Sequence, residues 1–155
     1  MYKSFENIIK EHGDAVYRYA LACTKDTHLS EDIFQDTFLL LLEKKPKFTH
    51  KNQLRVWLIR TARYIIIKHR RKAESTRTQP LDTVTVQHTD TSTLELYELM
   101  DMLSDTLKEA ALLYYIEDMS VKDISKALEI SVSAVKVRLK RAREALKNIL
   151  EEDKV

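Results

Sequence analysis

Apolar residues recur at three- and four-residue steps along most of the chain, the spacing of one face of an α-helix. The first run, within residues 5–23, predicts one helix or two helices broken near Gly13. The next predicts a helix from about Glu31 to Lys45, with Ser30 as its N-cap and acidic residues in its first turn. The run Leu39 to Leu42 in this helix is interpreted as helix packing.

A third helix is predicted after Pro46, capped by Asn52 and extending to Lys72. Its expected core side consists of Leu54, Trp57, Leu58, Thr61 and Ile65. Residues 75–93 are rich in Ser and Thr and read as a flexible linker, in which Val84 and Val86 could form a short extended piece.

Helical periodicity restarts after the linker, at Leu94, Leu96, Leu99, Met102, Leu103 and Leu107. Ser120 is then expected to cap a short helix with Ile124 and Leu128 inward. Ser131 is expected to cap a second helix that carries Val135, Leu139, Ala142 and Leu146. Since only Glu129 and Ile130 separate these two helices, they must cross steeply, as in a helix-turn-helix. A turn of this kind favours glycine, so Glu129 at positive φ would cost about 1 kcal/mol.

Composition supports an all-α fold of two small helical domains, residues 1–74 and 94–155, joined by the flexible linker. The 155 residues include one Gly and two Pro, too few turn residues for a many-stranded sheet. The same scarcity excludes nucleotide-binding enzymes with glycine-rich phosphate loops. The chain opens on charged residues and holds no apolar run of about 18 residues, so a cytoplasmic protein is expected.

The net charge of +2 conceals a strong segregation of 26 basic and 24 acidic residues. No acidic residue occurs from Lys44 to Ala73, and a lone Glu144 interrupts the basic residues from Lys136 to Lys147. A basic run can be a solvated face, but two runs in two helical domains favour nucleic acid. Of the aromatic residues in the first basic run, Trp57 is expected in the core, whereas Phe48 and Tyr64 are freer to stack on unpaired bases.

No catalytic or metal centre is expected. The five histidines are scattered without ligand spacing or a cysteine partner, and Cys23, in an apolar run, is interpreted as a buried thiol. Neither a cofactor nor a small-molecule substrate is predicted, and the protein is not expected to be an enzyme.

The residues resemble the extracytoplasmic-function (ECF) group of bacterial sigma factors over nearly the whole chain. Residues 30–38 resemble the acidic, Gln-bearing segment of region 2, and residues 54–63 are similar to its WLyrIAR stretch, followed by the basic end 70–72. Residues 103–145 resemble region 4, and residues 131–143 its ISxxTVKSRLxRAR signature. The chain departs from the family where Tyr64 replaces the common Asn and Lys68 the common Asp.

For region 2 this resemblance implies two surfaces. Asp32, Gln35 and Asp36 would bind the clamp helices of the RNA polymerase β′ subunit. The specificity loop, which captures a flipped base of the minus-ten element, would comprise Phe48, Thr49, His50, Lys51, Asn52 and Gln53. Arg60, Arg63, Arg70 and Arg71 would hold the DNA backbone, and Tyr64 would stack on a base.

For region 4 the resemblance implies recognition of the minus-thirty-five element. Lys136, Val137 and Lys140 would face bases, and the other expected contacts are Ser133, Arg138, Arg141 and Arg143. Residues not needed for the domain's own core, among Leu112, Leu113, Tyr114 and Tyr115, are candidates for the polymerase β flap contact. An anti-sigma factor is a further expected partner.

The resulting prediction is a non-enzymatic sigma factor that binds core RNA polymerase and directs promoter recognition. The alternative is a free-standing helix-turn-helix regulator whose N-terminal bundle binds a protein or a ligand.

Overall fold

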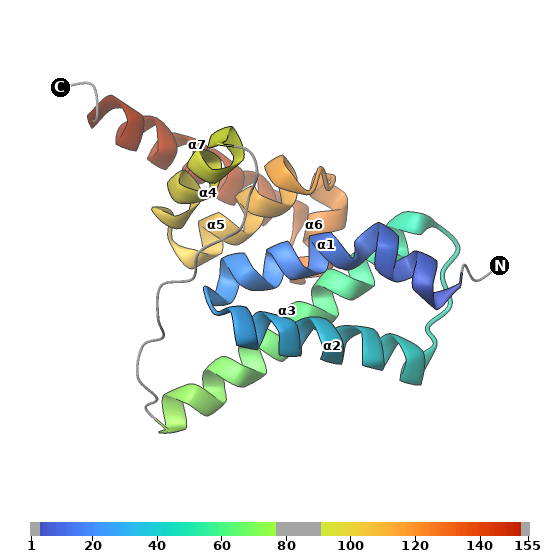
Figure 1. Ribbon diagram of the computed structural model, residues 1–155. Coiled ribbons are helices and arrows are strands. Elements are labelled where there is room, and N and C mark those ends of the chain that lie inside the picture. Colours follow the sequence, from blue (N-terminus) through green and yellow to red (C-terminus); the bar gives the residue numbers. More distant parts are fainter. Residues whose placement is uncertain (1–3, 77–90, 153–155) are drawn as a thin grey trace. The chain divides into compact units, whose positions relative to one another are not determined.

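The computed structural model describes residues 4–76 and 91–152, with side chains at 4–72 and 95–152 (Figure 1). Every regular element in these ranges is a helix, which confirms the all-α class. The chain divides into two compact units, Met1–Val84 and Thr85–Val155. Most of the predicted linker, including Val84 and Val86, lies outside the described residues.

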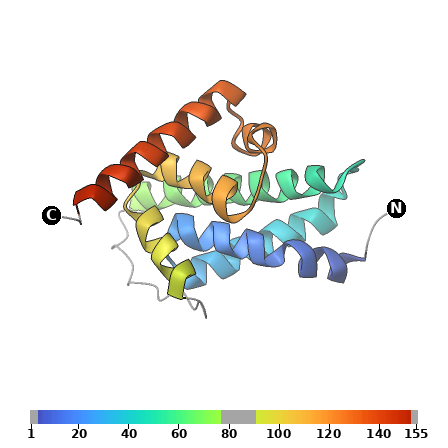
Figure 2. The same ribbon diagram turned by 90° about the horizontal axis from the view of Figure 1, so that it is seen from above.

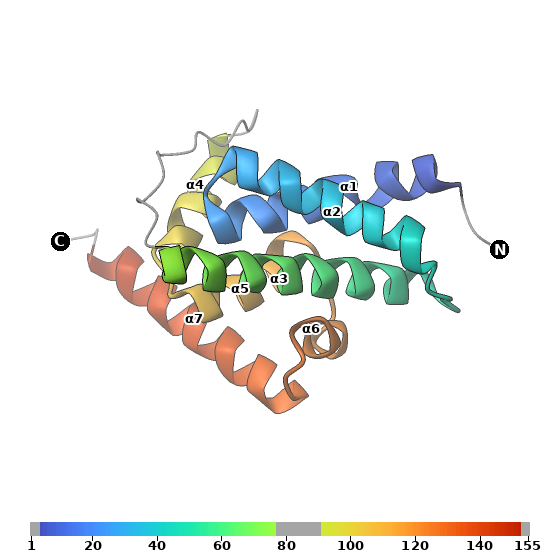
Figure 3. The same ribbon diagram turned by 90° about the horizontal axis from the view of Figure 1, so that it is seen from below.

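The first unit consists of α1 (Phe5–Thr24), α2 (Thr27–Lys44) and α3 (Lys51–Thr76), each of which packs against the other two (Figure 3). α1 continues through Gly13, so the alternative of two broken helices is not adopted. Gly13 is buried against α2, and a Cβ atom there would lie 3.3 Å from Cε2 of Phe34. The absent side chain therefore allows the two helices to approach closely.

The predicted start of α2 was wrong by one turn. Asp26, not Ser30, is the N-cap, and its Oδ1 accepts a 3.2 Å hydrogen bond from the Leu29 amide. Ser30 is fully buried inside the helix, with its Oγ 3.0 Å from Oγ1 of Thr24. A capping residue followed by acidic residues therefore does not mark the start of this helix. The Ser30 hydroxyl is satisfied instead by its hydrogen bond to Thr24, the last residue of α1.

α3 also differs from its predicted form in its cap and its core face. Asn52 lies inside the first turn, because the helix begins at Lys51. Of the expected core residues, Leu58 and Ile65 are buried, whereas Leu54, Trp57 and Thr61 are only half-buried. The buried face of α3 consists of Val56, Leu58, Ile59, Ala62, Ile65 and Ile66.

The second unit contains α4 (Thr91–Asp101), α5 (Asp105–Ala111), the π-helix η1 (Leu112–Ile116), α6 (Val121–Leu128) and α7 (Val132–Glu152) (Figure 2). α7 packs against both α5 and α6. Of the six apolar residues at which the helical periodicity restarts, Met102 is exposed, and Leu103 is buried in a cluster with Met100, Ala111 and Ala142.

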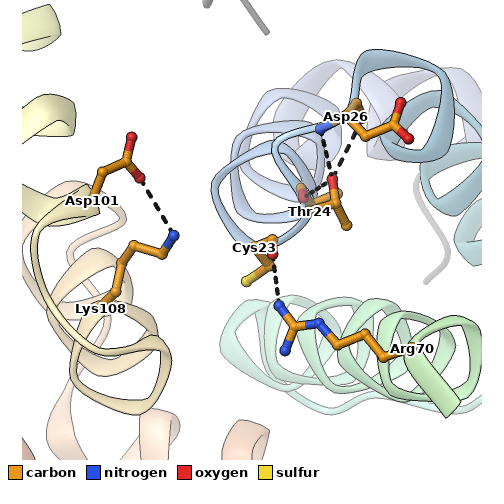
Figure 4. Close-up of polar contacts among 7 residues, drawn as sticks. Cys23, Thr24, Asp26, Arg70, Asp101 and Lys108 are labelled. Carbon is orange, nitrogen blue, oxygen red and sulfur yellow. Dashed lines mark hydrogen bonds and ion pairs between the residues drawn. The ribbon is translucent and has the colours of Figure 1, made fainter. Parts of the chain in front are cut away.

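A nearly buried lysine links the first two helices of this unit. Lys108 Nζ lies 3.3 Å from Oδ1 of Asp101 (Figure 4). Burying an ammonium group without a partner would be costly. The contact with the half-exposed Asp101 carboxylate therefore offsets part of the desolvation cost of the Lys108 ammonium group.

The predicted helix-turn-helix is confirmed in its caps and its core. The hydroxyls of Ser120 and Ser131 accept hydrogen bonds, both 3.0 Å long, from the amides of Asp123 and Ala134. Ile124, Leu128, Val135, Leu139 and Ala142 are buried, and Leu146 is half-buried.

The turn between these helices has the predicted left-handed backbone at Glu129, with φ 56° and ψ 43°. The amides of Glu129 and Ile130 both donate to the carbonyl oxygen of Ser125. The Ser125 hydroxyl in turn donates to the Ile130 carbonyl oxygen at 2.7 Å. Hydrogen bonds from both sides of the turn thereby offset the conformational cost at Glu129.

Candidate nucleic-acid and protein-binding surfaces

The exposed side of α2 carries the acidic face, which we define as Asp32, Gln35, Asp36 and Leu39. All four side chains are exposed, and their three- and four-residue spacing places them on one side of the helix. The opposite side supplies Ile33, Thr37, Phe38 and Leu41 to the core, and the buried Thr37 hydroxyl donates to the Ile33 carbonyl oxygen at 2.7 Å. α2 is therefore amphipathic, and its outer side combines negative charge with apolar area.

The interpretation of the Leu39 to Leu42 run as helix packing was wrong for its two ends. Leu39 is 58% exposed and Leu42 is 45% exposed, whereas Leu41 is buried. Single exposed leucines are common, but two beside an acidic face are typical of protein contact sites. Sequence reasoning missed Leu39 although its three-residue step from Asp36 was a signal.

An open groove of about 390 Å³ lies between α1 and α2, and Gln35 of the acidic face is one of its lining residues. Asp14 and Glu31 contribute carboxylates to its lining. Partial burial, and to a lesser extent the charge of Glu31, raise the pKa of the Tyr17 hydroxyl that also lines it. The groove adds further negative charge to this side of the unit.

The loop between α2 and α3 is held at both ends. Phe48 packs edge-on against Trp57, with ring centroids 6.4 Å apart and planes at 71°. The Gln53 side-chain carbonyl accepts hydrogen bonds from the Thr49 amide, at 2.9 Å, and from its hydroxyl, at 3.1 Å. These bonds leave His50, Lys51 and Asn52 as exposed side chains between two fixed points.

The predicted DNA-contacting residues of α3 differ in how accessible they are. Tyr64 is 67% exposed, and Arg71 is exposed as well, whereas Arg60 and Arg63 are half-buried. Arg70 is exposed but engaged, because its Nη2 donates a 2.6 Å hydrogen bond to the Cys23 carbonyl oxygen (Figure 4). The sequence offered no signal for this contact between distant parts of the chain.

Most of the predicted DNA-contacting side chains of α7 are exposed to solvent. Ser133, Lys136, Val137, Lys140, Arg141 and Arg143 are exposed. Arg138 differs, since it is half-buried at the edge of the packed side of the helix. Exposed lysines and a valine on one helix can offer donors and an apolar contact to base edges.

Arg143 has a partner outside α7. Its Nη1 donates a 3.2 Å hydrogen bond to the Tyr115 hydroxyl oxygen, and this bond is the main cause that raises the pKa of the Arg143 guanidinium. The structure also divides the four residues considered for a flap contact. Leu112 and Leu113 are fully buried, whereas Tyr114 and Tyr115 are 38% and 41% exposed.

The described residues hold neither a metal-ligand cluster nor a membrane-spanning helix. In the described part of the chain no group of three or more His, Cys, Asp or Glu side chains could hold a metal ion. None of the described helices is both long and apolar enough to cross a bilayer. Cys23 is half-buried rather than buried, and its thiol is not bonded to another cysteine.

Comparison with known proteins assigns both units to described families. Residues 8–76 match the model for sigma-70 region 2, and residues 93–146 match that for sigma-70 region 4. ECF RNA polymerase sigma factor SigM of Bacillus subtilis (strain 168) is 31% identical over 153 residues, which cover 93% of each chain. ECF RNA polymerase sigma factor SigW of the same organism is 28% identical, over 95% of this chain and 89% of the relative.

Solved structures share the fold at lower identity. The sigma factor RpoE of Bartonella quintana, in complex with the anti-sigma factor NepR, has a TM-score of 0.78 at 20% identity, with 97% of this chain and 98% of that chain covered. CnrH in complex with the cytosolic domain of CnrY has a TM-score of 0.71 at 23% identity, with 96% and 88% covered.

Proposed function

Because the chain belongs to the ECF RNA polymerase sigma factors, non-enzymatic proteins that bind core polymerase and recognise promoters, we propose a division of these tasks among its surfaces. The acidic face binds the clamp helices of the β′ subunit, the loop 48–53 and α3 engage the minus-ten element, and α7 reads the minus-thirty-five element. The observation that carries the proposal is the segregation of charge within the first unit, where an acidic outer side of α2 is followed by a stretch, residues 44–73, without an acidic residue.

The acidic face suits a basic protein surface and not DNA. Asp32 and Asp36 would be repelled by phosphates, and complementary charge raises the rate and the specificity of protein association. Leu39 and Leu42 supply apolar area, which contributes about 25 cal/mol per Å² when a partner covers it. Carboxylates around a leucine contact thus form a polar rim around an apolar centre.

The loop is suited to capture an unpaired base. Its two ends are fixed by the Phe48–Trp57 contact and by the Thr49–Gln53 hydrogen bonds, so His50, Lys51 and Asn52 project from a shaped backbone. Extruding a base costs a few kcal/mol, and a pocket that accepts only the flipped base favours melting by differential binding. Gln53 shapes this loop, and the exposed Tyr64 ring offers a stacking surface on α3.

On α7, Lys136, Val137 and Lys140 face bases, since lysine can bond to guanine O6 and N7 and valine can contact a thymine methyl group. Ser133, Arg138, Arg141 and Arg143 contact phosphates, which fixes the orientation of the helix on the duplex. Such contacts make the affinity fall steeply with salt.

Two further partners follow from the family. Tyr114 and Tyr115 are proposed as the β flap contact, because Leu112 and Leu113 are used in the domain's own core. An anti-sigma factor is proposed to cover the polymerase-binding surfaces, supported by the anti-sigma complex of the related RpoE fold. The protein would act where the polymerase acts, in the bacterial cytoplasm.

Reconstitution tests this proposal. Purified bacterial core polymerase with the full chain should give specific run-off transcripts from a subset of genomic promoters. Charge reversal at Asp36 should abolish them by loss of core binding, and alanine at both Lys136 and Lys140 should abolish them with core binding intact. Operator binding by the protein alone, without transcripts, would instead support a free-standing regulator.

A further inference from the structure

The π-helix η1 separates two buried residues from two exposed ones. The Glu117 amide donates to the Leu112 carbonyl oxygen five residues earlier, at 3.1 Å, which is the bond that defines this wider turn. Leu112 and Leu113 point into the core, and Tyr114 and Tyr115 lie at the surface. Single π turns inside α-helices are frequent at functional sites, because the extra residue redirects the side chains.

The two exposed tyrosines form a pair that restricts the position of the Tyr115 ring. Their ring centroids lie 5.0 Å apart with the planes at 85°, the edge-to-face geometry that aromatic rings prefer. The Tyr115 hydroxyl accepts the hydrogen bond from Arg143 Nη1 at 3.2 Å. A side chain of the π-helix thereby contacts a guanidinium on α7, 28 residues later.

Arg143 stands on the same side of α7 as the exposed Lys136 and Lys140, because four- and three-residue steps separate the three. A guanidinium has five N–H donors, of which the hydroxyl uses one, so the others remain available to a phosphate. A free arginine side chain samples many rotamers, and a restrained one loses less entropy when it binds.

We propose that Tyr115 is a positioning residue for promoter binding, which holds the Arg143 guanidinium in place for a phosphate beside the minus-thirty-five bases. This inference rests on the proposed role of α7 in DNA contact. It assigns a function to the π turn, since an uninterrupted α-helix would direct the Tyr115 side chain elsewhere. The tyrosine itself touches no DNA.

The test measures Tyr115→Phe against the unmodified protein in the complete holoenzyme, on a promoter duplex identified by run-off transcription. The change removes one hydroxyl and keeps the ring pair. Tyr115→Phe should weaken duplex binding about two- to fivefold, the effect of one modest hydrogen bond. It should also reduce the slope of log affinity against log salt.

The Arg143→Ala background completes the experiment. In this background the slope of log affinity against log salt should already be reduced by about 1, the value for one lost phosphate contact. Adding Tyr115→Phe should then change neither the affinity for the duplex nor this slope. An equal loss from Tyr115→Phe with and without Arg143, or no loss in either, would overturn the positioning role. Melting temperatures of the variants separate binding from folding, since a merely structural hydroxyl would lower them without moving the salt slope.

A different result would contradict the proposed role of α7 in DNA contact, on which the inference about Tyr115 rests. If alanine at both Lys136 and Lys140 leaves duplex binding unchanged, α7 does not carry DNA contact. If that double variant loses binding while Tyr115→Phe does not, only the positioning role is wrong.

Discussion

Arg70 of α3 donates a 2.6 Å hydrogen bond to the carbonyl oxygen of Cys23, next to the last residue of α1. Carbonyl groups at the end of a helix have no partner within the helix and favour a nearby positive charge. Neighbouring carbonyls of this end are satisfied locally, Ala20 by the Thr24 hydroxyl and Leu21 by the Lys25 amide. Arg70 completes the cap from a distant part of the sequence and joins α3 to the α1–α2 corner.

Arg70→Ala should therefore lower the free energy of unfolding by about 1 kcal/mol, because a charge-assisted hydrogen bond at a solvent-exposed position is lost. Urea denaturation of the full chain measures this effect. Arg71→Ala is the matched control, an exposed arginine one residue further along the same helix. Equal stability of the two variants would show that the Cys23 contact does not stabilise the fold.

Leu39→Ala should weaken core polymerase binding about five- to twentyfold, since a leucine covered by a partner contributes roughly 1–2 kcal/mol. The stability of the free protein should change by less than about 0.5 kcal/mol, because this side chain is exposed. Fluorescence anisotropy of the labelled protein with core polymerase gives the affinity. Leu150→Ala on α7 removes a 46% exposed leucine outside the acidic face and should leave the affinity for core polymerase unchanged.

Asn52→Ala should reduce promoter opening on the order of tenfold, which corresponds to about 1.4 kcal/mol of lost contact to the flipped base. Permanganate reactivity of unpaired thymines reports the opening. Since Asn52 lies outside the acidic face, the affinity for core polymerase should stay the same. A parallel loss of opening and of polymerase affinity would contradict the assignment of the loop to DNA.

Glu129→Gly should raise the free energy of unfolding by roughly 0.5–1 kcal/mol. The backbone at this position is left-handed, which a side chain disfavours and glycine adopts freely. Thermal and urea unfolding of the full chain report the change. Glu129→Ala retains a Cβ and should leave stability nearly unchanged, so a gain in both variants would point to the carboxylate and not to the backbone.

Local chemistry allowed the sequence to specify the helices and the helix-turn-helix. The caps at Ser120 and Ser131 and the positive φ at Glu129 depend on residues within about four positions, so they could be read from the chain. The separation of the acidic run of α2 from the basic run 44–73 is likewise a property of the sequence. These features, with the motifs of regions 2 and 4, were sufficient to predict the family.

Tertiary packing decided which side of each helix is buried and which polar groups meet. Ser30 had the sequence context of a cap, yet it is buried inside α2, where its hydroxyl is hydrogen-bonded to that of Thr24. Leu39 and Leu41 are chemically alike, and only the position of the neighbouring helices leaves the first exposed and the second buried.

The contacts of Arg70 with Cys23 and of Arg143 with Tyr115 join residues 47 and 28 positions apart. The sequence shows that these residues are basic, but a spacing rule extends over only one or two helical turns. It therefore could not identify their hydrogen-bond partners. Those partners depend on how the helices of each unit fold back on one another, which the packing within that unit determines.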